Sequence, residues 1–390
     1  MQKLWTRYFF ISLIISLAIM TGHYMLITSL PAFLASIGGS AADAGVLGGV
    51  FTLAALVSRP FLGKAIDARG RRIVLISGSI VILLASAVYP FLAVIPLLVI
   101  LRVFHGFGFS AFTTALNTAM ADIVPSQRLS EGLSYIGIAG TIATAFGPVI
   151  GLGLAGRSFG IFFATLALLS LAGIGGSGLM NYENRVRCEQ TRPSGQGKLF
   201  EKSALRCSIV LLLMCLPLDA VMIFISSYGA ERGFSQIHLF FPVHAIAMLL
   251  SRLTLGRLAD RIGPNFILLP SMAMGIFSFI LLAFARTDTM MIIASFVFGI
   301  PMGIAFTILH AILIRTSPRD SLGAANATMM AFADIGFGVG SIVMGLAIEH
   351  FGFTVFFLLG AACFLLSVLS YIYLLWNRPL QNTVALAAAE

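Results

Sequence analysis

The residues in this sequence with the greatest chemical potential are ionisable side chains inside long apolar runs. They are Asp219, Asp334, Arg102, His23 and His105. A charge in a hydrocarbon environment is costly, so each of these groups is expected to face water or a partner. Carboxylates can take up and release protons as their surroundings change, and histidine commonly ionises near neutral pH. These five residues are therefore the candidates for binding a proton or a charged small molecule.

Each candidate also has a purely structural interpretation. Arg102 would then be held by backbone carbonyls, and Asp334 would only shape the field of a pore or bind a cationic substrate directly. Asp219 follows Pro217, which is expected to free a backbone carbonyl and kink its helix. His244 and His310 also fall in apolar runs, where packing is as good an explanation as function.

The composition excludes several protein classes. Of 390 residues, 59% are hydrophobic and 10% are charged, and the mean hydropathy is +1.01. Soluble proteins carry about 25% charged residues. A soluble enzyme, a disordered protein and a nucleic-acid-binding domain are therefore excluded, despite a net charge of +9.

Apolar segments long enough to cross a membrane as helices recur along the chain. The sequence predicts an all-α membrane protein with twelve transmembrane helices, each near one of these ranges: 8–34, 44–66, 72–93, 95–121, 129–155, 158–181, 204–229, 235–257, 264–285, 289–314, 321–347 and 351–376. The first range resembles a signal peptide, but it continues without a convincing cleavage site, so we interpret it as a span.

Basic residues predict the orientation of these spans. Of the 24 Lys and Arg residues, eighteen lie in the N-terminus, the even-to-odd loops and the C-terminus, against three in the opposite loops. The positive-inside rule then predicts an inner-membrane protein with both termini in the cytoplasm. The longest polar stretch predicts a cytoplasmic linker at 182–203 between two six-helix bundles at 1–181 and 204–390.

The two predicted bundles repeat at a fixed offset of 193 residues. Ser58-Arg59 corresponds to Ser251-Arg252, and the matching continues through the pairs Gly63/Gly256, Asp67/Asp260, Gly70/Gly263, Gly106/Gly299, Pro125/Pro318 and Gly147/Gly340. Parallel repeats of this kind occur in secondary transporters that bind substrate between their halves.

Three motifs resemble those of the major facilitator superfamily over nearly the whole chain. The segment from Gly63 to Arg72, with Asp67, Gly70 and Arg71, resembles the loop between the second and third helices of that superfamily. Arg102, His105 and Gly106 resemble its fourth-helix motif. Gly147, Pro148 and Gly151 resemble the fifth-helix motif of the proton-coupled antiporter branch, which exports drugs and metabolites. The second half departs from this motif at Ser341, where the proline would be.

The resemblance implies that Asp67 forms a conformational switch with the basic residues beside it, and that Asp260 does the same in the second half. Gly63 would allow close helix approach and Gly70 a tight turn. The resemblance further implies a monomer that exports a small organic molecule, such as a cationic or amphipathic drug, by proton antiport and alternating access. A proton symporter for nutrient uptake, an exporter of a metal-chelating metabolite and a lipid flippase remain alternatives.

Nothing in the sequence supports catalysis. Its Gly-rich stretches lie inside spans and there is no P-loop, so we expect no enzyme, no cofactor and no nucleotide binding. The histidines lack metal-ligand spacing, so we expect no metal. The four cysteines lack close CxxC partners and are expected to be free thiols. The expected partners are a small-molecule substrate, protons and membrane lipids.

Overall fold

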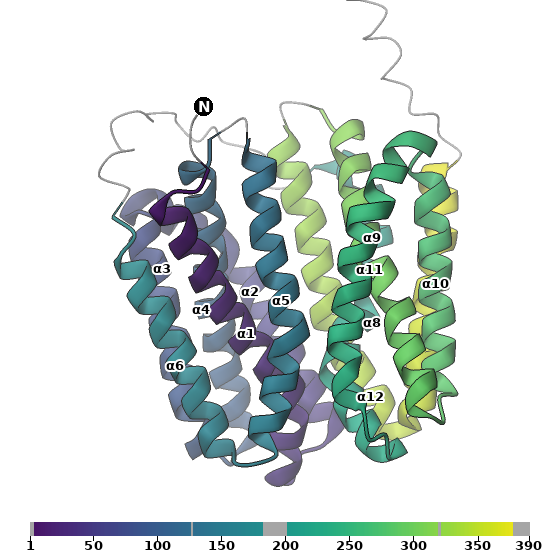
Figure 1. Cartoon of the computed structure of the whole chain (residues 1–390), viewed down its shortest axis with the longest axis horizontal. Helices are drawn as coiled ribbons and strands as arrows, with labels where there is room; N and C mark the ends of the chain where they lie inside the picture. The colour runs from purple at the N-terminus through teal and green to yellow at the C-terminus, as the bar shows by residue number, and fades with distance from the viewer. Residues whose placement is uncertain (1–3, 126–127, 182–200, 319–320, 377–390) are drawn as a thin grey trace, which may run out of the picture. The chain divides into compact units, whose positions relative to one another are not determined.

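The computed structural model describes residues 4–125, 128–181, 201–318 and 321–376. Their secondary structure is helical throughout (Figure 1), in the elements α1 (Arg7–Ser36), α2 (Ala41–Arg69), α3 (Arg71–Val88), η1 (Tyr89–Phe91), α4 (Ile95–Ile123), α5 (Leu129–Ala155), α6 (Phe159–Gly178), η3 (Lys202–Ala204), α8 (Leu205–Arg232), η4 (Ile237–Leu239), α9 (Phe240–Ile262), α10 (Asn265–Ala283), α11 (Asp288–Thr316), α12 (Leu322–Tyr371) and η6 (Ile372–Trp376).

Polar side chains mark where several helices begin. The hydroxyl of Ser40 accepts a hydrogen bond from the backbone N–H of Asp43, and the Asp43 carboxylate accepts one from the N–H of Ser40, which makes a reciprocal cap for α2. Thr6, Ser158 and Thr287 cap α1, α6 and α11 with one side-chain oxygen each. Caps of this kind satisfy N–H groups that the first helical turn leaves without partners.

Eleven helices in the described part of the chain are long and apolar enough to cross a membrane. The last of these candidate spans covers 52 residues, and its helix α12 contains one non-helical residue, Gly352, with φ of 78° and ψ of 176°. Fifty helical residues extend about 75 Å, more than twice the thickness of a bilayer core. The bend at Gly352 divides α12 into two spans, so the predicted membrane fold is confirmed and the two predicted segments 321–347 and 351–376 share this element.

The chain forms two compact units. The first contains Met1–Arg192 with Met222–Glu231, and the second contains Pro193–Val221 with Arg232–Glu390. Residues 182–200 of the predicted linker at 182–203 lie outside the described residues, so the predicted domain boundaries stay a prediction.

The two units use the same pattern of helix packing. In the first, α2 packs on α4, α3 packs on α4 and α6, and α1 packs on α5. In the second, α9 packs on α11 and α10 packs on α11 and α12. These helix pairs correspond under the offset of 193 residues that the sequence shows.

Glycine positions confirm this internal repeat. A Cβ atom at Gly106 would overlap the carbonyl oxygen of Phe51, and one at Gly299 would overlap the carbonyl oxygen of His244. The two glycines are 193 residues apart, and so are Phe51 and His244. Only glycine permits such backbone contact between two helices.

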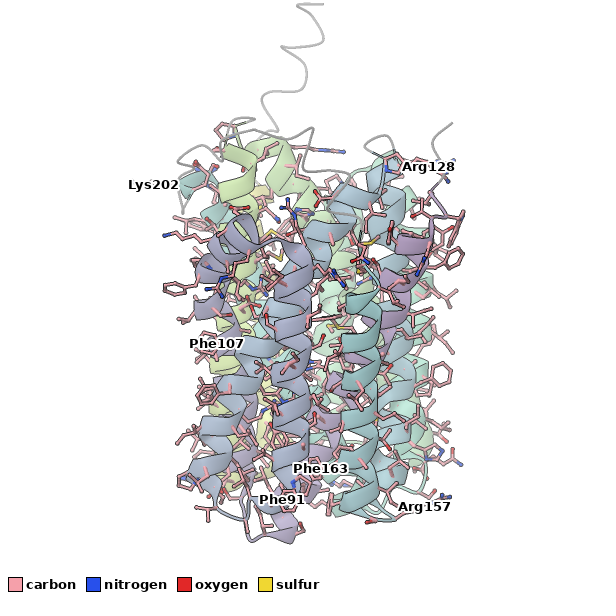
Figure 2. The ribbon with its side chains drawn as sticks, turned by 90° about the vertical axis from the view of Figure 1, so that its left-hand side faces the viewer. Phe91, Phe107, Arg128, Arg157, Phe163 and Lys202 are labelled. Atoms are coloured by element: carbon pink, nitrogen blue, oxygen red, sulfur yellow. The ribbon has the colours of Figure 1, made fainter. Side chains whose placement is uncertain are left out.

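Large apolar side chains also lie on the outside of the helices. Phe91, Phe61 and Leu168 are among the most exposed, and Phe107 projects outward from α4 (Figure 2). Exposed apolar side chains around a bundle of long apolar helices are typical of a surface solvated by lipid. The chain is therefore a multi-pass membrane protein.

Loops at opposite ends of the first unit carry Arg128 and Arg157. Arg128 precedes α5 at one end, whereas Arg157 follows α5 at the other end, where Phe91 and Phe163 also lie (Figure 2). The loops before and after α5 therefore lie at opposite ends of the unit, and the predicted cytoplasmic side stays a prediction.

Candidate functional site

The loop between α2 and α3 turns at a single glycine. Gly70 ends α2 and begins α3 with φ of 91°, and Gly263 ends α9 with φ of 100°. Side chains with a Cβ rarely adopt this conformation, so the predicted tight turn at Gly70 is confirmed and is repeated in the second unit.

Two arginines after this turn connect α3 to other helices. The Nε atom of Arg71 lies 2.9 Å from the Oδ2 atom of Asp122, near the end of α4. Arg72 donates a hydrogen bond of 2.5 Å to the carbonyl oxygen of Gly178, the last residue of α6. A cation at a helix C-terminus satisfies carbonyl groups there and complements the helix dipole. The loop is thereby fixed to two helices of its own unit.

The structure places the other residues of the predicted switch differently. Asp67 is exposed near the end of α2, and within the described residues its carboxylate has no ion pair. A Cβ atom at Gly63 would meet no described heavy atom within 4 Å, so the expected close helix approach there is wrong for this structure. The side chain of Asp260 lies outside the described residues.

Arg102 is buried inside the first unit, with 1% of its surface exposed. Its Nε donates a hydrogen bond of 3.0 Å to the carbonyl oxygen of Leu47 on α2. Its guanidinium carbon lies 4.3 Å from the centre of the Phe51 ring, a cation–π contact. Its Nη2 atom has no hydrogen-bond partner among the described residues. A carbonyl and an aromatic face therefore offset part of the cost of burying this charge.

His23 and His105 lie together beside Arg102. The ring of His23 stacks on Phe51 and Phe109, with centroid distances of 5.2 and 4.5 Å. His105 is 4% exposed, and its Nδ1 atom lies 3.3 Å from the hydroxyl of Tyr89. The structure thus brings three of the five sequence candidates into one aromatic cluster.

The remaining two candidates, Asp219 and Asp334, belong to the second unit. Asp219 lies on α8, and its Oδ2 atom lies 3.3 Å from the hydroxyl of Ser341 on α12, which shares its hydrogen between this carboxylate and the carbonyl oxygen of Phe337 at 2.8 Å. Asp334 lies two helical turns before Ser341 on α12 and is 9% exposed. The buried free thiol of Cys215 lies one helical turn before Asp219 on α8.

Glycines bring α8 and α12 into backbone contact beside these carboxylates. A Cβ atom at Gly336 would lie 2.7 Å from the carbonyl oxygen of Leu212, and Gly340 approaches the carbonyl of Leu216 even more closely. Small residues at a helix interface allow this approach. The two carboxylates therefore belong to a pair of helices that pack backbone to backbone.

The fifth-helix motif has the same role in the first unit. A Cβ at Gly147 would lie 3.0 Å from the carbonyl oxygen of Thr21, and one at Gly151 would lie 2.9 Å from the Cα of Met25. Pro148 lies inside α5 between them. This motif packs α5 directly on α1, the helix that carries His23.

Several residues of these sites were not found from the sequence, among them Phe51, Phe109 and Tyr89 of the aromatic cluster and two polar partners. Asp122 is the ion-pair partner of Arg71, and its position near the end of an apolar helix was the available signal. Ser341 is the hydrogen-bond donor to Asp219, and its position opposite the proline of the fifth-helix motif was the signal there.

The ranges that the structure describes bring no three His, Cys, Asp or Glu side chains together as metal ligands. Cys207, Cys215 and Cys363 carry free thiols, and Cys188 lies outside the described residues.

Known proteins resemble this chain over most of its length. It is 25% identical to the multidrug resistance protein MdtG of Rahnella sp. (strain Y9602) over 361 residues, which cover 87% of this chain and 85% of the relative. It is 22% identical to the staphylopine export protein of Staphylococcus aureus (strain Mu50 / ATCC 700699) over 360 residues, or 86% of this chain and 88% of that protein.

Solved structures share the fold at lower sequence identity. The nucleoside transporter NupG matches with a TM-score of 0.76 at 16% identity, covering 96% of this chain and 100% of that chain. The human organic anion transporter MFSD10 (TETRAN) matches with a TM-score of 0.66 at 16% identity, covering 93% of this chain and 98% of that chain.

The family model of the Major Facilitator Superfamily matches residues 12–285 and 207–390, which together span nearly the whole chain. With two helical units that repeat the same backbone contacts, and with these matches, the chain belongs to the Major Facilitator Superfamily of transporters.

Proposed function

We propose that this protein exports a small organic molecule across the inner membrane in exchange for protons, by alternating access. The observation that carries the proposal is the pair of carboxylates on α8 and α12. Asp219 and Asp334 lie on membrane-spanning helices that pack through Gly336 and Gly340. Carboxylates in this setting can be neutral or ionised according to their access to water, which is what proton exchange requires.

The relatives support export as the direction of transport. Two of the similar proteins are named for multidrug resistance and for staphylopine export. A cationic or amphipathic substrate complements two carboxylates, and the energy would come from the proton gradient. The basic residues of the even-to-odd loops support an orientation with both termini in the cytoplasm.

The loop between α2 and α3 would contribute to alternating access. The ion pair of Arg71 with Asp122 and the bond of Arg72 to α6 stabilise the arrangement described here. A second arrangement would exchange these partners, with the exposed Asp67 available as one alternative.

A reconstituted system tests the proposal. Purified protein in liposomes is given a pH gradient, and the internal pH is followed after addition of ethidium or of other fluorescent amphipathic compounds. Ethidium movement that dissipates the gradient is expected in the unaltered protein. The Asp334→Asn variant is expected to lose the substrate-dependent proton flux, because an amide cannot carry a proton.

Matched variants show whether the loss is specific. Glu231→Gln removes an exposed carboxylate at the end of α8 and is expected to leave the flux unchanged. Equal pH dependence in the Asp334→Asn variant and the unaltered protein would exclude Asp334 as the proton carrier, and Asp219→Asn would then be tested.

Export of a metal-chelating metabolite is the second candidate. The similarity to a staphylopine export protein favours it, at nearly the same identity and coverage as the similarity to MdtG. Liposomes that move staphylopine but no fluorescent cation would support this candidate over multidrug export. Proton-driven accumulation in the opposite direction would instead support uptake by symport.

A further inference from the structure

A small cavity lies inside the first unit, among α1, α3, α4 and α6. Its polar lining residues are His23, His105, Ser86 and Ser170, and Gly22 and Phe109 also line it. Its volume of about 10 Å³ is enough for one water molecule and for little else.

The serines in this cavity are placed to accept hydrogen bonds. The hydroxyl of Ser86 donates to the carbonyl oxygen of Ile82 at 2.8 Å, and that of Ser170 donates to the carbonyl oxygen of Leu166 at 2.8 Å. Each serine hydrogen is therefore engaged within its own helix, while each oxygen keeps lone pairs for another donor. A water molecule in the cavity can donate one hydrogen to either of these oxygens and keeps its second hydrogen for another acceptor.

The two histidines supply further partners for that water. The Nδ1 atom of His105 faces the Tyr89 hydroxyl at 3.3 Å, which leaves Nε2 for a second hydrogen bond. His23 makes ring contacts with Tyr24, Phe51 and Phe109 and has no hydrogen bond to another described side chain. A buried water normally makes two to four hydrogen bonds, and these four polar side chains provide them.

The charged and titratable groups around the pair come from several elements. Tyr24 lies beside His23 on α1, Arg102 lies on α4, and Tyr89 lies in η1; the charge of Arg102 acts on Tyr89 and on both histidines. The other helices around the pair contribute Phe51 from α2, Ser86 from α3 and Ser170 from α6. The positive charge of Arg102 disfavours an imidazolium on either ring, and two imidazolium ions would also repel each other, so the pair holds at most one added proton.

We propose that His23, one water molecule and His105 form a proton-sharing site inside the first unit. A proton on His23 passes to the water while the water gives one of its own hydrogens to Nε2 of His105. The water is regenerated, His23 becomes neutral, and His105 becomes the cation, with its Nδ1–H donating to the Tyr89 oxygen. This inference rests on the proposed proton exchange, and it names where the first unit holds the proton.

A substitution at a glycine tests the role of the water without changing either histidine. A Cβ at Gly22 would lie 3.6 Å from Leu166 and 3.7 Å from Leu169, which are ordinary contacts. Gly22→Ala therefore adds a methyl group to a residue that lines this cavity, where it is expected to compete with the water for space, and leaves both histidines intact. Gly140→Ala is the matched control, because its Cβ would meet no described heavy atom within 4 Å.

The water site is tested without substrate or gradient. The chain has six histidines, so protein with ¹⁵N-histidine in lipid nanodiscs gives few ring signals, which His→Gln variants assign. We expect magnetisation to pass from water to the rings of His23 and His105 in the unaltered protein and in Gly140→Ala. The transfer is expected to disappear in Gly22→Ala.

His244 serves as an internal reference in the same spectrum. It is fully buried, and neither ring nitrogen has a hydrogen-bond partner among the described residues. No transfer to its ring is expected. Absence of transfer at His23 and His105 in the unaltered protein, or its persistence in Gly22→Ala, would overturn the proposed site.

A transport measurement tests the role of the site. If the liposome assay shows ethidium–proton exchange, Gly22→Ala is expected to slow it about tenfold or more, while ethidium–ethidium exchange stays unchanged. A normal rate of proton exchange in Gly22→Ala would overturn the role in transport. No proton-driven movement in the unaltered protein would refute the proposed function, and the spectra would still decide whether the water site exists.

Discussion

The ion pair between Arg71 and Asp122 offers a quantitative test of how firmly the loop between α2 and α3 is held to α4. Arg71 and Asp122 are 27% and 10% exposed, so the pair lies between the surface and the interior. Exposed pairs contribute about 0.2–1 kcal/mol, and breaking a buried pair costs about 3–5 kcal/mol. We therefore expect a coupling free energy of about 1–2 kcal/mol between these two side chains.

A double-mutant cycle measures this coupling. Arg71→Gln, Asp122→Asn and the double variant are unfolded reversibly in mixed micelles, and the free energies of unfolding are compared at low and at high salt. The coupling should decrease by less than half at high salt, because Asp122 is largely shielded from solvent. A coupling of about 1–2 kcal/mol corresponds to about a fivefold to thirtyfold change in the equilibrium constant of unfolding.

Asp67 provides the matched control for this cycle. It is another acid near the same loop, but it is exposed and has no ion pair within the described residues. A cycle of Arg71→Gln with Asp67→Asn should give a coupling near zero. A larger coupling to Asp67 than to Asp122 would show that the arginine has a different partner in the membrane and would refute the assignment.

Four other substitutions test the backbone contacts, the bend in α12 and the buried charge. Gly106→Ala and Gly299→Ala should each lower the free energy of unfolding by about 1–3 kcal/mol, because the added methyl overlaps a carbonyl oxygen of the neighbouring helix; Gly140→Ala should not, and equal unfolding temperatures for all three would contradict the packing. Gly352→Ala should cost about 1–3 kcal/mol, since φ of 78° with ψ of 176° is a conformation essentially restricted to glycine; a loss below about 0.5 kcal/mol in the same unfolding titration would mean that the bend is not fixed as described. Arg102→Lys should lower the thermal unfolding temperature although the charge is kept, because lysine lacks the planar group that contacts both Leu47 and Phe51; a temperature within about 1 °C of the unaltered protein would refute that role.

The spans and the repeat were predictable from the sequence because their signals are local. Apolar length alone marks a membrane helix, and a fixed offset is visible without any structure. The offset of 193 residues reappears in the turns at Gly70 and Gly263 and in the contacts of Gly106 and Gly299. The bend in α12 at Gly352 lies two residues after the short gap between the last two predicted segments, 321–347 and 351–376.

The partners of individual side chains were beyond the sequence. A soluble helix is polar on one face, which reveals the side it buries, but a helix in lipid is apolar on both. The sequence therefore does not show which face of α4 or of α12 points into the protein, and Asp122 and Ser341 lie on these two helices. His23, His105 and Arg102 were identified as candidates, but their sharing of one aromatic cluster depends on how the helices are rotated.

The two halves share one hydrogen bond between helices, in which the acceptor is a backbone carbonyl in both but the donor side chain differs. In the first unit the carbonyl oxygen of Leu47 accepts from the guanidinium of Arg102, and in the second the carbonyl oxygen of Phe240 accepts from the hydroxyl of Ser295 at 2.5 Å. The two acceptors and the two donors are each 193 residues apart. A neutral donor in the second unit therefore makes the helix-to-helix hydrogen bond that a buried cation makes in the first. The first unit thus holds a buried cation and has Leu26 and Thr141 at the positions that match Asp219 and Asp334, so the two halves carry buried charges of opposite sign.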